Sequence, residues 1–96
     1  ELEKIAALDG IDMLFFGPAD FTQGIGCPLD FSNPKVVETR KRVAETAKKY
    51  GKLAGTTGSP ENFEELKAMG YNLINICADV IALGKVYNES LAKIGR

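Results

Sequence analysis

Histidine and tryptophan are absent from these 96 residues, and cysteine and methionine occur only twice each. Without histidine, the chain lacks the commonest general base and the commonest ligand of transition metals. Any metal ion held here would be bound by oxygen atoms, which favours Mg²⁺, Mn²⁺ or a similar hard ion. The sequence also lacks an apolar run near the roughly 20 residues that span a bilayer, so no membrane partner is expected.

The two cysteines and the balance of charge are typical of a cytoplasmic protein. Cys27 lies in a Gly/Pro-rich stretch and Cys77 in an apolar one, and no motif joins them into a disulfide framework or a metal site. Twelve basic and 13 acidic residues give a formal net charge of −1. No basic stripe is present, so nucleic acid is not expected as a partner. No charged-then-apolar leader argues for export.

Helical and strand-like patterns alternate along the chain. Helices are predicted over residues 1–8, 34–50, 59–69 and 79–94, and strands over 11–16, 52–57 and 72–77, with a long loop over 17–33. Such alternation predicts parallel strands joined by right-handed crossovers. Three parallel strands rarely make a complete sheet. We therefore expect an α/β fold in which residues 1–96 are a single segment, the last three βα units of a (β/α)8 TIM barrel.

Familiar residue types mark the helix boundaries. The predicted stops are Gly10, Gly51 and Gly70, and the predicted N-terminal caps are Ser32 or Asn33, Ser59 and Asp79. The charges from Lys35 to Lys49 are expected to form a solvated helix face. Lys52 opens the second strand at the end opposite to the expected active face, which argues against a Schiff-base role for this lysine.

The residues Gly17-Pro18-Ala19-Asp20 follow directly on the apolar strand Ile11–Phe16. The carboxyl end of a buried parallel strand is where α/β proteins carry their chemistry. Asp20 is therefore either a metal ligand or catalytic carboxylate, or only the cap of a short helix over residues 20–24. The consecutive amides from Gly17 to Thr22 form either an oxyanion-binding nest or a plain turn. The residues alone leave both alternatives open.

Thr57 ends the second predicted strand, in the stretch Thr56-Thr57-Gly58-Ser59. Because the carboxyl ends of parallel strands meet at one edge of the sheet, Thr57 either lines the same pocket as Asp20 or has only a structural role. The nearby Gly24-Ile25-Gly26 lacks the third glycine of a dinucleotide fingerprint, so a nucleotide site is not expected there.

Residues 11–22 resemble the sixth-strand segment of the HpcH/HpaI aldolase family, an apolar strand followed by Gly-Pro-Ala/Ser-Asp-Leu-Ser. Later features agree in order and spacing: Asn33-Pro34 opening a helix, Gly51-Lys52 before a strand, Met69-Gly70 before the last strand and Ala78-Asp79 after it. The resemblance covers essentially the whole chain. It implies a metal-dependent (class II) aldolase that cleaves a 4-hydroxy-2-oxo acid to pyruvate and an aldehyde.

The resemblance assigns roles to only a few positions. Asp20 matches the metal-binding aspartate of the family, and the backbone of Ala19 and Asp20 matches the amides that hold the carboxylate of pyruvate. Thr57 stands where many relatives have an apolar residue that lines the pocket. The implied cofactor is a divalent metal, Mg²⁺, Mn²⁺ or Co²⁺. No catalytic residue is assigned to this chain, because the histidine, the arginine and the second carboxylate of the family belong to earlier strands.

Two alternatives stay open beside the aldolase. One is a non-catalytic fragment or assembly module, and the other is part of a citrate-lyase-β-type CoA-ester lyase. The last predicted helix has an apolar face made of Val80, Leu83, Tyr87, Leu91 and Ile94. Three short strands are too few to cover that face. In the resembled family the C-terminal helix contacts a neighbouring subunit, so a homo-oligomer through this helix is expected.

Overall fold

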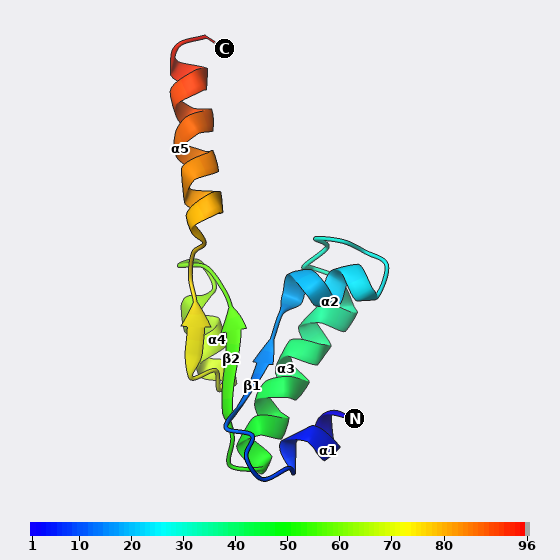
Figure 1. Cartoon of the computed structure of the whole chain (residues 1–96). Helices are drawn as coiled ribbons and strands as arrows, with labels where there is room; N and C mark the ends of the chain where they lie inside the picture. Colours follow the sequence, from blue (N-terminus) through cyan, green and yellow to red (C-terminus); the bar gives the residue numbers. More distant parts are fainter. Residues whose placement is uncertain (96) are drawn as a thin grey trace.

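The computed structural model describes residues 1–95, which form a small parallel sheet with helices around it (Figure 1). The elements are α1 (Leu2–Ala6), β1 (Met13–Phe16), α2 (Pro18–Gly24), α3 (Pro34–Lys49), β2 (Leu53–Thr57), α4 (Phe63–Met69), β3 (Leu73–Asn75) and α5 (Asp79–Lys93). The three strands are all parallel and lie in the order β1-β2-β3. The expected alternation and strand direction are confirmed.

One face of the sheet carries the core. Helix α3 packs against β1 and β2, and α1, α2 and α4 pack against α3. The buried apolar side chains are Ala6, Leu14, Phe16, Val36, Val43, Ala44, Ala47, Ala54, Leu66 and Tyr71. They come from the helices, from alternate positions of β1, from Ala54 of β2 and, for Tyr71, from the turn before β3.

The opposite face of the sheet is apolar but uncovered. Phe15, Leu53 and Leu73 are all exposed there, and the strand register places Gly55 between Phe15 and Leu73. Parallel sheets normally have both faces covered. The uncovered apolar face therefore fits a part of a larger α/β structure.

The long loop expected over residues 17–33 is interrupted by a helix. Helix α2 begins at Pro18, one residue after β1 ends, with Gly17 at its N-terminal cap position. The fixed backbone angle of proline suits the first position of a helix, and the ring of Phe21 packs edge-on against Phe16, with centroids 5.4 Å apart. The sequence allowed a short helix over residues 20–24, and α2 begins two residues earlier than that, at Pro18.

Two of the predicted helix caps are wrong. Helix α4 begins at Phe63 rather than at Ser59, because Asn62 Oδ1 accepts hydrogen bonds from the Ser59 amide at 2.7 Å and the Ser59 hydroxyl at 3.2 Å, which closes a turn before the helix. Asp79 lies inside α5, whose cap is Ala78. Asn33 does cap α3, since its side chain accepts from the Lys35 amide at 2.9 Å.

Two of the three predicted glycine stops are confirmed. Gly51 follows the C-cap of α3 and Gly70 is the C-cap of α4, with φ values of 68° and 114°. This left-handed region is open to glycine at no steric cost. Gly10 also has a positive φ, 87°, but α1 ends at Ala6 with Ala7 as its C-cap, so Gly10 turns the chain towards β1 and does not end the helix.

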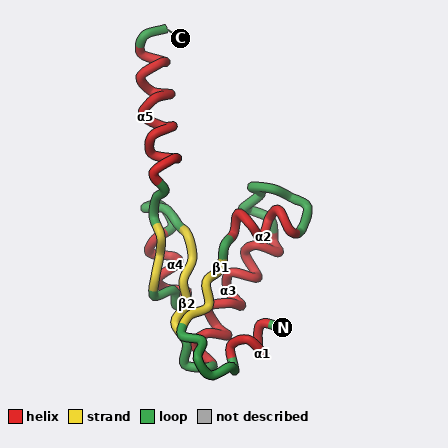
Figure 2. The backbone as a smooth tube through the Cα atoms, in the orientation of Figure 1, coloured by secondary structure: helices red, strands yellow, loops and turns green. Residues whose placement is uncertain are grey.

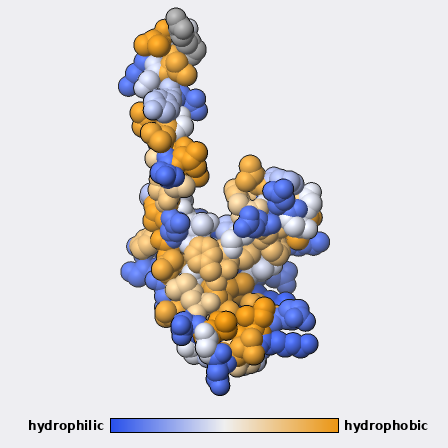
Figure 3. Space-filling view, viewed as in Figure 1, coloured by the Kyte–Doolittle hydropathy of each residue, from blue (hydrophilic) through white to orange (hydrophobic). Residues whose placement is uncertain are grey.

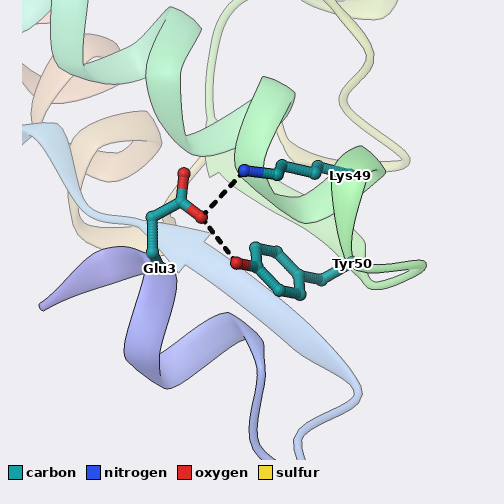
Figure 4. Close-up of polar contacts among 3 residues, drawn as sticks. All are labelled: Glu3, Lys49 and Tyr50. Carbon is teal, nitrogen blue, oxygen red and sulfur yellow. Dashed lines mark hydrogen bonds and ion pairs between the residues drawn. The ribbon is translucent and has the colours of Figure 1, made fainter.

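Polar side chains link α1 to the C-terminal end of α3, near the amino ends of the strands. Glu3 of α1 accepts hydrogen bonds from Lys49 Nζ at 3.2 Å and the Tyr50 hydroxyl at 2.7 Å (Figure 4). The bond from Tyr50, followed by that from Lys49, lowers the pKa of Glu3. Lys52 Nζ donates to the Leu8 carbonyl at 3.0 Å, at this same end of the strands. This places Lys52 away from the carboxyl ends of the strands, as predicted.

Helix α5 projects away from the rest of the chain (Figures 1 and 2). None of its side chains is buried, and apolar residues show along its length (Figure 3). The molecule is accordingly elongated, with extents of 55 × 26 × 23 Å. Within residues 1–95, every helix is too short or too polar to cross a membrane.

Candidate active site at the carboxyl ends of the strands

The carboxyl ends of the three strands are fixed side by side by two hydrogen bonds. The Thr56 hydroxyl donates to the Phe16 carbonyl at 2.9 Å, which ties β2 to β1. The Gly58 amide donates to the Asn75 carbonyl at 2.9 Å, which ties β2 to β3. The turns that follow β1, β2 and β3 therefore open on one edge of the sheet.

A cavity of about 380 Å³ lies at this edge. Its lining is Ala19, Leu29, Phe31, Thr57, Gly58, Asn75, Ile76, Cys77, Ala78 and Ile81. Two of the three residues proposed from the sequence, Ala19 and Thr57, are thus brought together although 38 positions apart. The walls are mostly apolar with a few polar groups, the usual character of a small-molecule site.

Asp20 lies beside this cavity but does not line it. It is the third residue of α2 and its side chain is exposed. The structure gives its carboxylate no hydrogen bond or ion pair within residues 1–95, and Gly17, not Asp20, occupies the cap position. The capping alternative for Asp20 is therefore wrong. A Cβ built on Gly17 would lie 3.7 Å from Asp20 Oδ2, an ordinary contact distance, so the Asp20 carboxylate lies close to Gly17 at the end of β1.

The amides of Ala19 and Asp20 are free of helix bonds. The first intrahelical bond of α2 runs from the Phe21 amide to the Gly17 carbonyl at 3.0 Å. The preceding N–H groups have no partner within a helix and carry its partial positive charge. They are correctly disposed to donate to an anionic group beside the strand end.

The loop from Ile25 to Phe31 forms one wall of the cavity and was not predicted as part of the site. It is anchored by Thr22, which is fully buried. The Thr22 hydroxyl donates to the Ala19 carbonyl at 2.8 Å and accepts from the Leu29 amide at 3.0 Å. Leu29 has a φ of 63°, a costly left-handed conformation for a leucine. Backbone strain of this kind is concentrated at functional sites.

A second cavity, of about 270 Å³, adjoins the first. It is lined by Pro18, Phe31, Arg40, Thr57, Gly58, Ser59 and Asn62. Arg40 contradicts the prediction of a fully solvated charged face on α3, because this residue is half-buried and lines the cavity. The signal was present in the sequence: Arg40 follows Val36 by four positions and precedes Val43 by three, which places it in the apolar stripe of the helix.

The described residues do not form a metal site by themselves. No cluster of three or more histidine, cysteine, aspartate or glutamate side chains occurs within residues 1–95. Asp20 is an exposed, unpaired carboxylate at the strand end, which suits one oxygen ligand of a hard divalent ion. It fits such an ion only together with ligands from outside this stretch.

Known proteins match this chain along its whole length. A hydroxypyruvate/pyruvate aldolase of Paraburkholderia phytofirmans is 30% identical over 98% of the chain, and a 2-keto-3-deoxy-L-rhamnonate aldolase of Klebsiella pneumoniae is 30% identical over 95% of it. The chain covers only 36% and 34% of these relatives.

A solved structure shows the same fold. An HpcH/HpaI aldolase/citrate lyase family protein from Burkholderia cenocepacia J2315 is 32% identical and superposes with a TM-score of 0.85, over 100% of this chain and 38% of its own. Three βα units that account for about a third of such a protein agree with the predicted part of a (β/α)8 barrel. The model of the HpcH/HpaI aldolase/citrate lyase family matches residues 1–84, and the chain belongs to that family.

Proposed function

We propose that the protein is a metal-dependent aldolase that cleaves a 4-hydroxy-2-oxo acid to pyruvate and an aldehyde. The observation that carries the proposal is the meeting of Ala19, Asp20 and Thr57 at one strand-end edge. The family membership and the names of the aldolase relatives support the reaction class. The small, mostly apolar cavity suits a substrate of a few carbon atoms.

Asp20 would hold the divalent metal, Mg²⁺, Mn²⁺ or Co²⁺, together with a carboxylate from outside these residues. Its exposure and its lack of a partner within residues 1–95 leave both oxygens available. When bound, such an ion supplies Lewis-acid stabilisation of the negative charge that C–C cleavage develops.

The amides of Ala19 and Asp20 would bind the carboxylate of the 2-oxo acid. Their position in the first turn of α2 gives two donors with fixed directions, and fixed donors orient a substrate without reorganisation during the reaction. Thr57 would contact the remainder of the substrate. Its hydroxyl would add a polar group to a mostly apolar wall, and we expect it to influence which aldehyde is accepted.

The test is pyruvate release by the protein expressed from its complete reading frame. Retro-aldol cleavage of a 4-hydroxy-2-oxo acid should depend on added Mg²⁺, Mn²⁺ or Co²⁺ and stop with a chelator. Asp20→Asn should weaken Mn²⁺ binding, measured by calorimetry, and remove most of the activity, because an amide is a poorer ligand for a hard cation.

Asp30→Asn is the matched control. Asp30 is an exposed aspartate of the neighbouring loop whose carboxylate accepts from the Ser32 hydroxyl at 3.0 Å, and its replacement should leave Mn²⁺ affinity unchanged. Equal Mn²⁺ affinity in Asp20→Asn and the unaltered protein would remove Asp20 from the metal site.

A further inference from the structure

We propose that Thr22 is a positioning residue of the candidate active site. Its hydroxyl holds the peptide group between Ala19 and Asp20 and the loop that walls the cavity in one arrangement, and so sets the affinity for the carboxylate of the 2-oxo acid. The inference rests on the proposed aldolase function, which it extends by naming a residue that acts through Asp20 without touching the substrate. It follows from two hydrogen bonds of one buried side chain.

Thr22 is enclosed within the chain and does not reach the substrate itself. It belongs to α2, has 0% of its surface exposed and lines neither cavity. Asp20, two positions earlier in the same helix, is exposed at the strand ends. Burying a hydroxyl without a hydrogen-bond partner is costly, so the partners of this hydroxyl show what the residue holds in place.

The first bond of Thr22 fixes the peptide group that carries the Asp20 amide. The Thr22 hydroxyl donates to the Ala19 carbonyl oxygen at 2.8 Å. This oxygen and the N–H of Asp20 belong to one planar peptide unit. Holding the oxygen therefore fixes the direction of the N–H on the opposite side of the unit. A hydrogen bond to the carbonyl also polarises the peptide group and makes its N–H a stronger donor.

The second bond of Thr22 extends this arrangement to the wall of the cavity. The Leu29 amide donates to the Thr22 hydroxyl oxygen at 3.0 Å, and the Cys27 amide donates to the Thr22 carbonyl at 2.9 Å. Leu29 has a φ of 63°, a conformation that leucine keeps only where its surroundings fix it. The hydroxyl is therefore the centre of a hydrogen-bond relay that runs from the Leu29 amide to the peptide group of Asp20.

The relay acts on substrate binding and not on the bond-breaking step. In the proposed reaction, the carboxylate of pyruvate stays unchanged while the C–C bond forms or breaks. An interaction with that carboxylate is equally strong in the ground state and in the transition state, so its loss raises KM and leaves kcat unchanged. A threonine that served only to stabilise the fold would change the melting temperature and the amount of active protein, without raising KM for pyruvate.

The experiment measures KM and kcat for pyruvate in the aldol-forming direction, with the complete protein, Mn²⁺ and saturating glyceraldehyde. Thr22→Val keeps the shape of the side chain but removes the hydroxyl, so KM for pyruvate should rise about 3- to 10-fold, the effect of one lost hydrogen bond. The value of kcat should stay nearly the same, and Thr22→Ser, which retains the hydroxyl, should restore KM. Where Thr22→Val does not fold, Thr22→Ala removes the same hydroxyl with a better helix former.

Thr46→Val is the matched control, because Thr46 is another buried helical threonine, with 4% of its surface exposed, and lines neither cavity. Its KM for pyruvate should equal that of the unaltered protein. An unchanged KM in Thr22→Val, or a rise that Thr22→Ser shares in full, would overturn the relay.

Hydrogen exchange in the protein without metal or pyruvate examines the Leu29 end of the relay. The Leu29 amide should exchange faster in Thr22→Val, because its acceptor is lost, and at the original rate in Thr22→Ser. Equal exchange in Thr22→Val and the unaltered protein would contradict the relay at this bond.

Calorimetric titration of pyruvate into the Mn²⁺-loaded protein separates the relay from the proposed function. A pyruvate affinity that falls in Thr22→Val and returns in Thr22→Ser supports the relay even in an inactive protein, and only the aldolase function then fails. An active protein whose pyruvate affinity is the same in all three forms retains the aldolase function and loses the relay. A protein that neither turns over nor binds pyruvate contradicts both.

Discussion

Tyr71 shows how one buried residue links the core to the candidate site. Only 4% of its surface is exposed, and its hydroxyl donates to the Arg40 carbonyl at 2.6 Å. That bond fixes the backbone of α3 at the residue whose guanidinium lines the second cavity. A change at Tyr71 therefore acts on stability and on the placement of Arg40 together.

Tyr71→Phe should lower stability at neutral pH but not at high pH. At pH 8 the lost hydrogen bond should cost about 0.5–1.5 kcal/mol in the free energy of unfolding. Burial raises the pKa of Tyr71 from 10.0 to about 12, while the charge of Arg40 lowers it to a lesser extent. Because the unfolded chain ionises first, the contribution of Tyr71 is complete below pH 10 and is lost as the pH rises towards 12.

Urea unfolding of the complete protein at pH 8 and near pH 11 measures this difference. The deficit of the Phe variant should shrink at the higher pH, and the titration of other groups cancels because both proteins share them. A deficit that is the same at both pH values would contradict the assigned pKa of Tyr71.

Individual residues of the site differ in how far the sequence reveals them. The sequence singled out Asp20 and Thr57 because each lies at the end of a recognisable strand, and the carboxyl ends of parallel strands are where α/β proteins carry their active sites. Arg40 and Asn62 were not found, since their roles depend on tertiary packing that brings α3 and the turn before α4 under the strand ends. The only local signal for Arg40 was a charge within an apolar helical stripe.

At the scale of elements, the turn between β2 and α4 requires a glycine at position 58. A Cβ built there would lie 2.6 Å from Leu66 Cδ1 and 3.0 Å from both Asn62 Oδ1 and Ile74 Cγ2. Gly58→Ala should therefore destabilise the protein by about 1–3 kcal/mol, the usual cost of overpacking. It should also disturb the Ser59–Asn62 turn, which lines the second cavity.

The control for Gly58→Ala is Gly24→Ala at the end of α2, where a Cβ meets nothing within 4 Å. That change should be neutral or slightly stabilising, since alanine has the higher helix propensity. Denaturant unfolding of both variants measures the contrast. A Gly58→Ala protein as stable as Gly24→Ala would show that the turn relaxes around the added methyl group.

The elements themselves were largely predictable. Period-2 and period-3.6 patterns gave the order of strands and helices, and glycines with positive φ fixed the ends of α3 and α4. The failures lie at helix beginnings. Helix α2 begins at Pro18, not at the Asp20 cap that the sequence allowed. The start of α4 depends on the Asn62 side chain accepting from Ser59, not on Ser59 acting as the cap. Both are choices between competing local hydrogen bonds, which composition does not decide.

Helix α5 carries apolar side chains that the rest of the chain does not bury. Val80, Tyr87 and Ile94 are each more than 60% exposed, and exposed apolar faces of this kind mark interaction surfaces. We expect this helix to contact a second subunit in the complete protein. Replacing Tyr87 and Leu91 together by serine should reduce the assembled mass in sedimentation experiments, whereas Asn88→Ser should not. An unchanged mass combined with a lower melting temperature would instead place the helix against its own subunit.

At the scale of the whole molecule, the 96-residue chain by itself should release no pyruvate from a 4-hydroxy-2-oxo acid. It offers one carboxylate at the strand ends, and the described residues hold no cluster of three metal-ligating side chains. It also has no histidine to move a proton. One face of its sheet and all of α5 are exposed, so water is not excluded from the site.

The purified chain should first be checked for secondary structure by circular dichroism. Pyruvate release by this chain with Mg²⁺, Mn²⁺ and Co²⁺ should then match that of controls containing the metal alone. Turnover above those controls by the chain alone would mean that the site is complete within these residues, and the assignment of the remaining ligands to other strands would then be wrong.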